Sequence, residues 1–184
     1  MGMATIIHAF DWPDRVIVGS VGEPGSRTFY LQARAGNRIV SVALEKEQSA
    51  LLAEKIEEIL DELMDQKGNP ASVPAETPIE LVDNDPLEQP VDAEFRTGAM
   101  SLGWDPSTAQ VVIEAYPLIL VDEGATDQIE LEPTEMLLVR IPVGTARAFA
   151  KRTLEVVGAG RPICSVCGTA IDPDGHVHTL PDDL

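Results

Sequence analysis

The sequence contains only two cysteines and three histidines among its 184 residues. It also lacks any apolar run near the roughly 18 to 20 residues that a transmembrane helix requires. The basic start and apolar block of a secretory signal peptide are absent from the N-terminus. We therefore expect a cytoplasmic protein without a membrane partner. Its 44% hydrophobic content is sufficient for the core of an ordinary globular domain.

Basic residues are scarce as well. Thirteen Lys and Arg stand against 31 Asp and Glu, which gives a formal net charge of −18. Such a chain repels phosphate backbones over about one Debye length, roughly 8 Å in physiological salt, so we expect no nucleic-acid partner. The sequence has no glycine-rich phosphate loop, nucleophile elbow or His-Glu-x-x-His motif, and these absences disfavour the corresponding enzyme classes.

The first half of the chain predicts strands followed by a helix. Residues 15–21, 28–34 and 38–44 are apolar or alternating at strand length and are separated by turn signals, which indicates an antiparallel meander. Residues 6–10 add a short strand. From residue 46 apolar side chains recur every three or four positions, which predicts an amphipathic helix that ends at Gly68, before Pro70. The first unit is assigned to residues 1–68.

Residues 69–93 form an acidic, proline-rich stretch with no Lys or Arg. Prolines and mutual repulsion between carboxylates oppose regular structure, so an exposed connector is predicted. Its apolar patch at residues 79–82 leaves two alternatives open, docking on the body or full disorder.

The second half, residues 94–159, repeats this order. Strands are predicted at residues 95–102, 110–119 and 136–141, and a helix at residues 143–157. The fold class is therefore α+β, with a duplicated β-β-β-α unit, antiparallel sheets and two main helices. Ordinary α+β patterning without duplication remains the alternative.

Residues 160–184 contain both cysteines and two of the three histidines. Cys164 and Cys167 have the spacing and the following glycine of a zinc knuckle, and a turn at residues 172–175 returns the chain to His176 and His178. Four ligands indicate a closed, structural zinc site rather than a catalytic one. The alternatives are an exposed cysteine pair with free tail histidines, or a redox pair.

Other polar and aromatic residues carry weaker signals. Arg147, Lys151 and Arg152 cluster on the second predicted helix, as a binding surface for an acidic partner or as a solvated face that contacts the acidic connector. His8 is expected to be a core or edge residue with satisfied hydrogen bonds. Trp12 and Trp104 are expected to cover the ends of the core.

The stretches "RTFYLQAR", "VSVALEKEQ", "ARAFAKR" and "GRPICSVCG…DPDGH" resemble an actinobacterial family of uncharacterised, ParJ-like proteins. That family combines a duplicated strand-rich body with a C-terminal Cys-Pro-x-Cys-Gly…Asp-Pro-x-Gly-His-x-Cys motif. The resemblance implies no established enzymatic activity and a protein partner such as a ParA-type ATPase. By position, Cys164, Cys167 and His176 match the family's candidate ligands. Ser165 replaces the usual proline, and His178 stands where the family has cysteine.

The leading hypothesis is a non-enzymatic, cytoplasmic binding or regulatory protein with a structural zinc ion. The alternative is a metal-dependent hydrolase or small-molecule enzyme that uses the C-terminal metal or a pocket between the two units. The sequence indicates neither the oligomeric state nor a substrate.

The C-terminal motif predicts one zinc ion per chain. Thiolate and imidazole ligation stabilises small zinc modules by about 10 kcal/mol, so Cys164→Ser should abolish zinc retention and expose the chain after Arg161 to proteases. The main unfolding transition should stay nearly unchanged, since the core precedes this segment. Elemental analysis and limited proteolysis measure both effects. A zinc content near zero in freshly purified, chelator-free protein would contradict the site.

Overall fold

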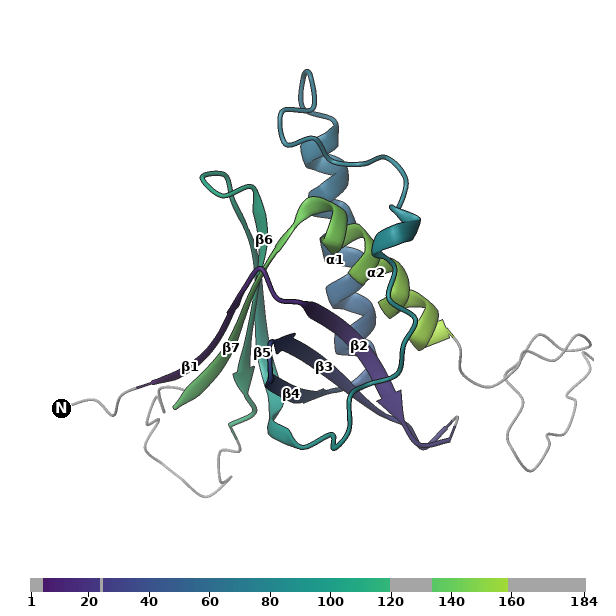
Figure 1. Cartoon of the computed structure of the whole chain (residues 1–184), viewed down its shortest axis with the longest axis vertical. Coiled ribbons are helices and arrows are strands. Elements are labelled where there is room, and N and C mark those ends of the chain that lie inside the picture. Colours follow the sequence, from purple (N-terminus) through teal and green to yellow (C-terminus); the bar gives the residue numbers. More distant parts are fainter. Residues whose placement is uncertain (1–4, 24, 120–133, 159–184) are drawn as a thin grey trace, which may run out of the picture.

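The computed structural model describes residues 5–23, 25–119 and 134–158, which form an α+β fold (Figure 1). The strands are β1 (Ile6–Asp11), β2 (Arg15–Val21), β3 (Thr28–Ala35), β4 (Arg38–Leu44), β5 (Ala93–Asp105), β6 (Gln110–Pro117) and β7 (Glu135–Pro142). The helices are α1 (Lys46–Met64), the short 3-10 helix η1 (Ile79–Leu81) and α2 (Val143–Gly158). Each predicted strand and both main helices are present; β2 and β4 have the predicted bounds, and the ends of the others are shifted.

The described strands form a single mixed sheet in the order β1-β7-β6-β5-β4-β3-β2. β2, β3 and β4 form an antiparallel meander, and so do β5, β6 and β7. The expectation of antiparallel sheets is corrected by two parallel pairs, β4 with β5 and β1 with β7. The β4–β5 pair joins the two meanders, so neither half of the chain has a sheet of its own.

The two edges of this sheet meet at one corner. β1 and β2 lie at opposite ends of the strand order, yet only residues 12–14 separate them in sequence. The amide of Trp12 donates to the Arg140 carbonyl on β7, and the amide of Asp14 donates to the Arg34 carbonyl on β3. Figure 1 shows the two halves of the sheet diverging from this corner. The short turn therefore bends the whole sheet.

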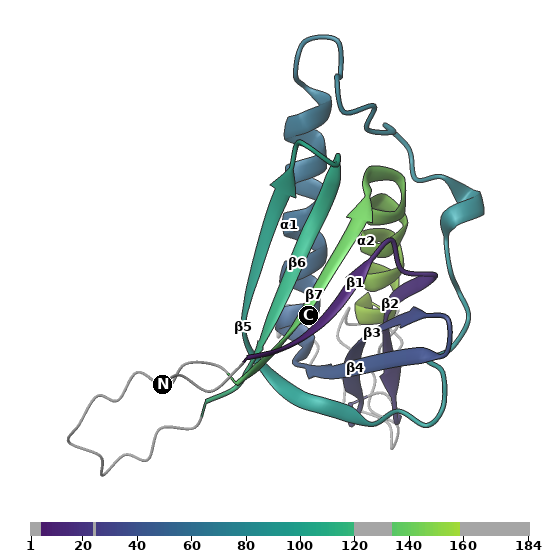
Figure 2. The same cartoon turned by 60° about the vertical axis from the view of Figure 1, so that its left-hand side comes forward.

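Both long helices pack on the inner side of the bent sheet. Figure 2 shows α1 and α2 behind strands β5, β6, β7 and β1. The two helices contact each other, and α2 also lies against β2. Successive side chains of a strand point to opposite faces of the sheet, so every second strand residue points inward. These inward side chains form one core with the apolar sides of both helices. This core contains, among others, Val18, Leu31, Val42, Ile113, Val139, Ile56, Leu60 and Phe149.

α1 begins and ends with recognisable signals. The side chains of Glu45 and Gln48 each accept a hydrogen bond from the other's backbone amide, which forms a capping box at the N-terminus. The helix ends at Met64, four residues before the predicted end at Gly68, which adopts a φ of +81° in the turn that follows. Among the described residues, no helix is long and apolar enough to cross a membrane.

The acidic connector lies against the body. Val73 and Leu87 are buried. In the patch considered for docking, Leu81 packs against Gly144 of α2, whereas Ile79 is 85% exposed. Leu87 packs over Gly19 on the side of β2 opposite to the core residue Val18. The connector therefore covers the outer side of the β2 meander, which a proline-rich, acidic composition does not predict.

A side chain at Gly19 should displace the connector. A Cβ atom there would lie 2.5 Å from Cγ of Leu87, so Gly19→Ala should lower the free energy of unfolding by about 1 to 3 kcal/mol. Gly103→Ala is the matched control in β5, because a Cβ atom there meets nothing within 4 Å. Urea unfolding of both variants, alone and with Leu87→Ala, measures the coupling. If Gly19→Ala lowers the free energy of unfolding equally in the presence of Leu87 and in the Leu87→Ala background, this packing is contradicted.

Candidate functional site

The predicted zinc ligands Cys164, Cys167, His176 and His178 lie outside the described residues. The zinc site therefore stays a prediction. The three basic residues of the second predicted helix do lie in the described part, on α2, and their environments differ strongly.

Arg147 is a buried residue between the two helices, with 4% of its surface exposed. Its guanidinium forms ion pairs with Glu57 and Asp61 of α1, the latter at 2.8 Å. Its Nε donates to the carbonyl of Pro74 at 2.9 Å. Arg147 thus joins α2 to α1 and to the start of the connector.

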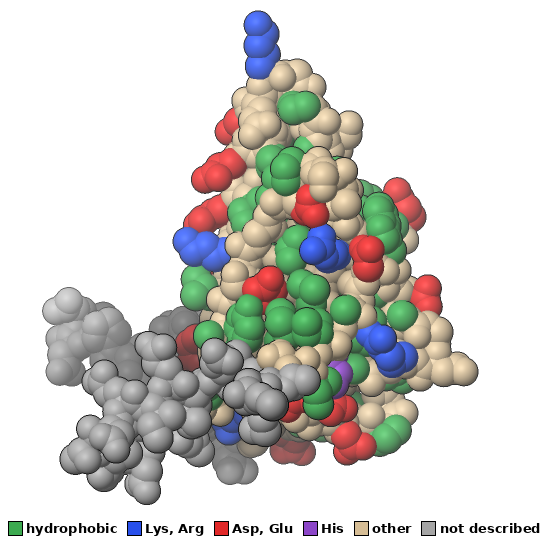
Figure 3. Space-filling model, turned by 90° about the vertical axis from the view of Figure 1, so that its left-hand side faces the viewer, with side chains coloured by type: hydrophobic (Ala, Val, Ile, Leu, Met, Phe, Trp, Pro, Cys, Tyr) green, Lys and Arg blue, Asp and Glu red, His purple; other side chains and the backbone are tan. Residues whose placement is uncertain are grey.

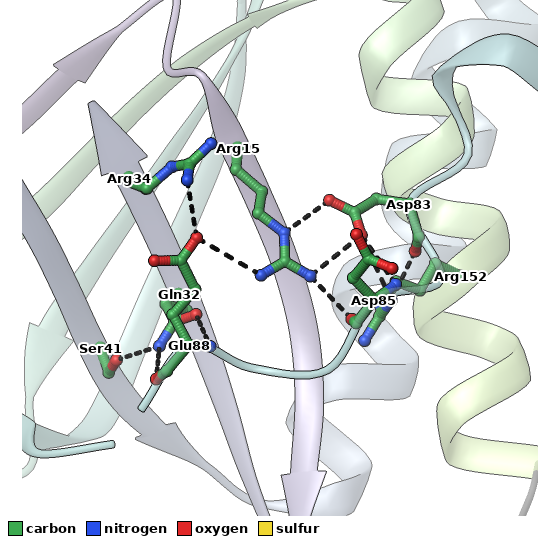
Figure 4. A network of polar contacts seen from close by, with 8 residues as sticks. All are labelled: Arg15, Gln32, Arg34, Ser41, Asp83, Asp85, Glu88 and Arg152. Carbon is green, nitrogen blue, oxygen red and sulfur yellow. Dashed lines mark hydrogen bonds and ion pairs between the residues drawn. The ribbon is translucent and has the colours of Figure 1, made fainter. Parts of the chain in front are cut away.

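Arg152 and Arg15 bind the middle of the connector from two sides (Figure 4). Arg15 on β2 donates from Nε and Nη2 to both carboxylate oxygens of Asp83, at 2.6 and 3.0 Å. Arg152 donates to the backbone carbonyls of Asp83 and Val18, and its Nη1 lies 3.7 Å from the Asp83 carboxylate. Because β2 is an edge strand of the sheet, Arg152 satisfies a carbonyl that no neighbouring strand binds.

The Asp83 carboxylate offsets the two positive charges in this cluster. The hydrogen bond from Arg15 lowers the pKa of Asp83 against the opposing effect of burial, so Asp83 stays ionised at neutral pH. Burial lowers the pKa of Arg152, and the negative charge of Asp83 opposes that effect. The aspartate therefore serves as a shared counter-ion for both arginines.

Glu88 continues this attachment further along the connector (Figure 4). Its carboxylate pairs with Arg34 on β3 at 2.9 Å. Its backbone amide and carbonyl bind the side-chain amide of Gln32, which is buried and also donates to Ser41. Gln32 thus mimics a neighbouring strand for the connector backbone.

Two of the three basic residues that were expected on the surface of the second helix make these internal contacts instead. Arg147 and Arg152 are buried, and only Lys151 is exposed, where it pairs with Glu155 one helical turn away. Arg152 contacts the acidic connector, as in the alternative interpretation, but Arg147 and Arg152 are buried and do not form a solvated face. Binding of an acidic partner by these three residues stays untested.

The opposite half of the sheet has an outer face that no described helix or connector residue covers. Here "outer face" means the side of β1, β7 and β6 that points away from the core. Its apolar members, which alternate with buried core residues, are Ile7 and Ala9 on β1, Met136 and Leu138 on β7, and Val112 on β6. The Arg140–Asp105 ion pair borders the face at one end, and the Tyr116–Glu114 hydrogen bond at the other. Figure 3 shows hydrophobic side chains gathered on this side of the molecule.

An exposed tryptophan follows β1 at the corner turn. Trp12 directly follows β1 and is 59% exposed, so it does not cover the core as expected. Its backbone adopts a φ of +55° in the corner turn, where the chain leaves β1 for β2. Trp104 does pack against the core, as expected.

Two further features bring ionisable side chains together. His8 on edge strand β1 lies 3.1 Å from the carboxylate of Glu135, and Glu94 is close to both. Sequence reasoning anticipated the edge position of His8 but not its neighbours, which come from strands β5 and β7. A hollow of about 370 Å³ near the start of α1 is lined partly by Arg27, Lys46 and Arg96, with Phe29 and Glu45. Its lining thus combines basic side chains with the carboxylates of Glu45 and Glu47.

Comparison with known proteins gives one match. A family model described as "Protein of unknown function (DUF3090)" matches residues 8–178. No curated protein and no solved structure matches the chain.

The buried arginines should be needed for stability. Arg147→Met and Arg152→Met should each lower the free energy of unfolding by about 1.5 to 3 kcal/mol, because each leaves partners of a charged hydrogen bond unpaired. Lys151→Met is the matched control on the same helix, and its exposed pair should contribute less than about 1 kcal/mol. Thermal and urea unfolding measure the three variants. Equal stability of all three would contradict the internal role.

Proposed function

We propose that the chain, which belongs to the DUF3090 family of proteins of unknown function, is a non-enzymatic binding or regulatory protein. Its partner binds to the outer face of β1, β7 and β6. The observation that carries the proposal is that the outer faces of the two halves of the sheet are covered differently. The connector covers the outer side of the β2 meander, while the other half presents Ile7, 53% exposed, and Trp12, 59% exposed.

The composition of this face suits protein recognition. Tryptophan residues are enriched among the side chains that dominate binding energy, and apolar surface with a polar border is the usual arrangement at interfaces. β1 pairs with β7 on one side only, and on its other edge the Ala9 carbonyl accepts from Arg38, so within the described part of the chain the portion before Ala9 is the part we propose for main-chain hydrogen bonds with a partner. An acidic chain with a net charge of −18 favours a partner with a basic surface around its apolar contacts.

A ParA-type ATPase is the partner that we propose, on the strength of the family resemblance in the sequence. We also propose that Cys164, Cys167, His176 and His178 bind a structural zinc ion, and that the protein acts in the cytoplasm. The motif spacing supports the first of these proposals, and the composition supports the second.

A duplication of one β-β-β-α unit is a further proposal. β2, β3 and β4 form a meander that leads directly into α1, and β5, β6 and β7 form a meander that leads directly into α2. This common order supports an origin by duplication. The rival function, a metal-dependent hydrolase or small-molecule enzyme, would use the tail metal or the hollow near α1, which lies where β3, β4 and β5 meet.

Two substitutions on the proposed binding surface should weaken the complex. Trp12→Ala and Ile7→Asp should each reduce affinity for the purified ParA-type ATPase of the same cell by about thirtyfold, the effect of removing a typical interface anchor. Leu51→Asp on α1 is the matched control, because Leu51 is also 53% exposed. Biolayer interferometry gives the affinities. Absence of any complex with the native chain would contradict the partner, and equal affinities of all variants would contradict the surface.

A further inference from the structure

Three strands bring a histidine and two glutamates together at one place on the surface. His8 comes from β1, Glu94 from β5 and Glu135 from β7. Their potential ligand atoms all lie within 4.8 Å of one another, and His8 Nε2 is 3.1 Å from Glu135 Oε2.

The charges in this cluster are not balanced by basic side chains. Among the described residues, neither carboxylate has a lysine or arginine within ion-pair distance, and His8 is the single basic neighbour of Glu135. Every other buried or half-buried cluster of carboxylates described above contains an arginine, as at Asp83 or Glu57. Two nearby carboxylates without such a partner attract a cation.

The donor set and its spacing fit a metal ion. We propose that His8, Glu94 and Glu135 bind one divalent first-row transition-metal ion, such as zinc. Imidazole nitrogen and carboxylate oxygen are ordinary zinc ligands, with bonds of about 2.0 to 2.2 Å, so ligand atoms around one ion lie about 3 to 3.5 Å apart. A set without sulfur also suits manganese or ferrous iron.

The site is open rather than closed. The side chains of His8 and Glu135 are 20% and 24% exposed, and Glu94 is exposed. Three protein ligands leave at least one coordination position for water or for a donor from outside the chain. This separates the site from the four-ligand tail motif.

The test uses the full chain with the tail ligands removed. Cys164→Ser, Cys167→Ser, His176→Gln and His178→Gln together form the background, so that zinc bound to the tail does not contribute. Zn²⁺ titrated into this protein by isothermal calorimetry should saturate one site per chain. His8→Gln, Glu94→Gln and Glu135→Gln should each weaken binding by at least about tenfold. Glu80→Gln, an exposed glutamate on η1, is the control and should bind like the background.

A second measurement locates the ion. Two-dimensional ¹⁵N NMR of the background protein should show shifts at residues 8, 94 and 135 on addition of Zn²⁺. Thermal unfolding without metal should be the same for the three variants, which confirms that they are folded. The proposal is overturned if no saturable binding occurs, if several weak ions bind without preference, or if Glu94→Gln and Glu135→Gln leave the affinity unchanged.

Discussion

The closed corner between β1 and β2 is the constraint on which the architecture depends. Because three residues connect strands at opposite ends of a sheet, the sheet has to bend until its edges approach each other. The Arg38 guanidinium fixes this approach, since it donates to the carbonyl of Ala9 and lies 4.1 Å from the ring centre of Phe10. The bend creates an inner space that both helices fill. It also leaves two outer faces that differ in what covers them.

Buried arginines attach the connector to this bent sheet. In a chain with a net charge of −18, few cations are available, and the structure uses several of them internally. Arg15 and Arg152 share Asp83, and Arg147 joins the two helices. Each guanidinium has several donors in a fixed plane, so it binds carboxylates and backbone carbonyls together, which a lysine does poorly. The acidic connector therefore packs against an acidic body without an excess of repulsion.

The sequence patterns predicted the individual strands and helices, but they did not predict which strands pair with each other. The alternation in residues 15–21 and 38–44 and the apolar spacing after Lys46 predicted strands and a helix, because both periods are properties of short segments. The parallel pairing of β4 with β5, and of β1 with β7, depends on contacts between distant residues. Arg152 has the sequence context of an exposed helical residue, and only the adjacent edge strand explains its burial. The cluster around His8 likewise requires three strands from distant parts of the chain.

The pairing of β1 with β7 has a consequence for the order of folding. Among the described strands, β1 pairs with β7 alone, residues 6–11 with residues 135–140, so during synthesis the first strand emerges long before its partner. Until then, an apolar segment that includes Ile6 and Ile7 has no neighbour in the sheet. Contacts of such long sequence separation slow folding, and unpaired strands are prone to aggregate. The meander of β2, β3 and β4, whose pairings are local, is therefore the natural starting point for folding, and β1 joins last.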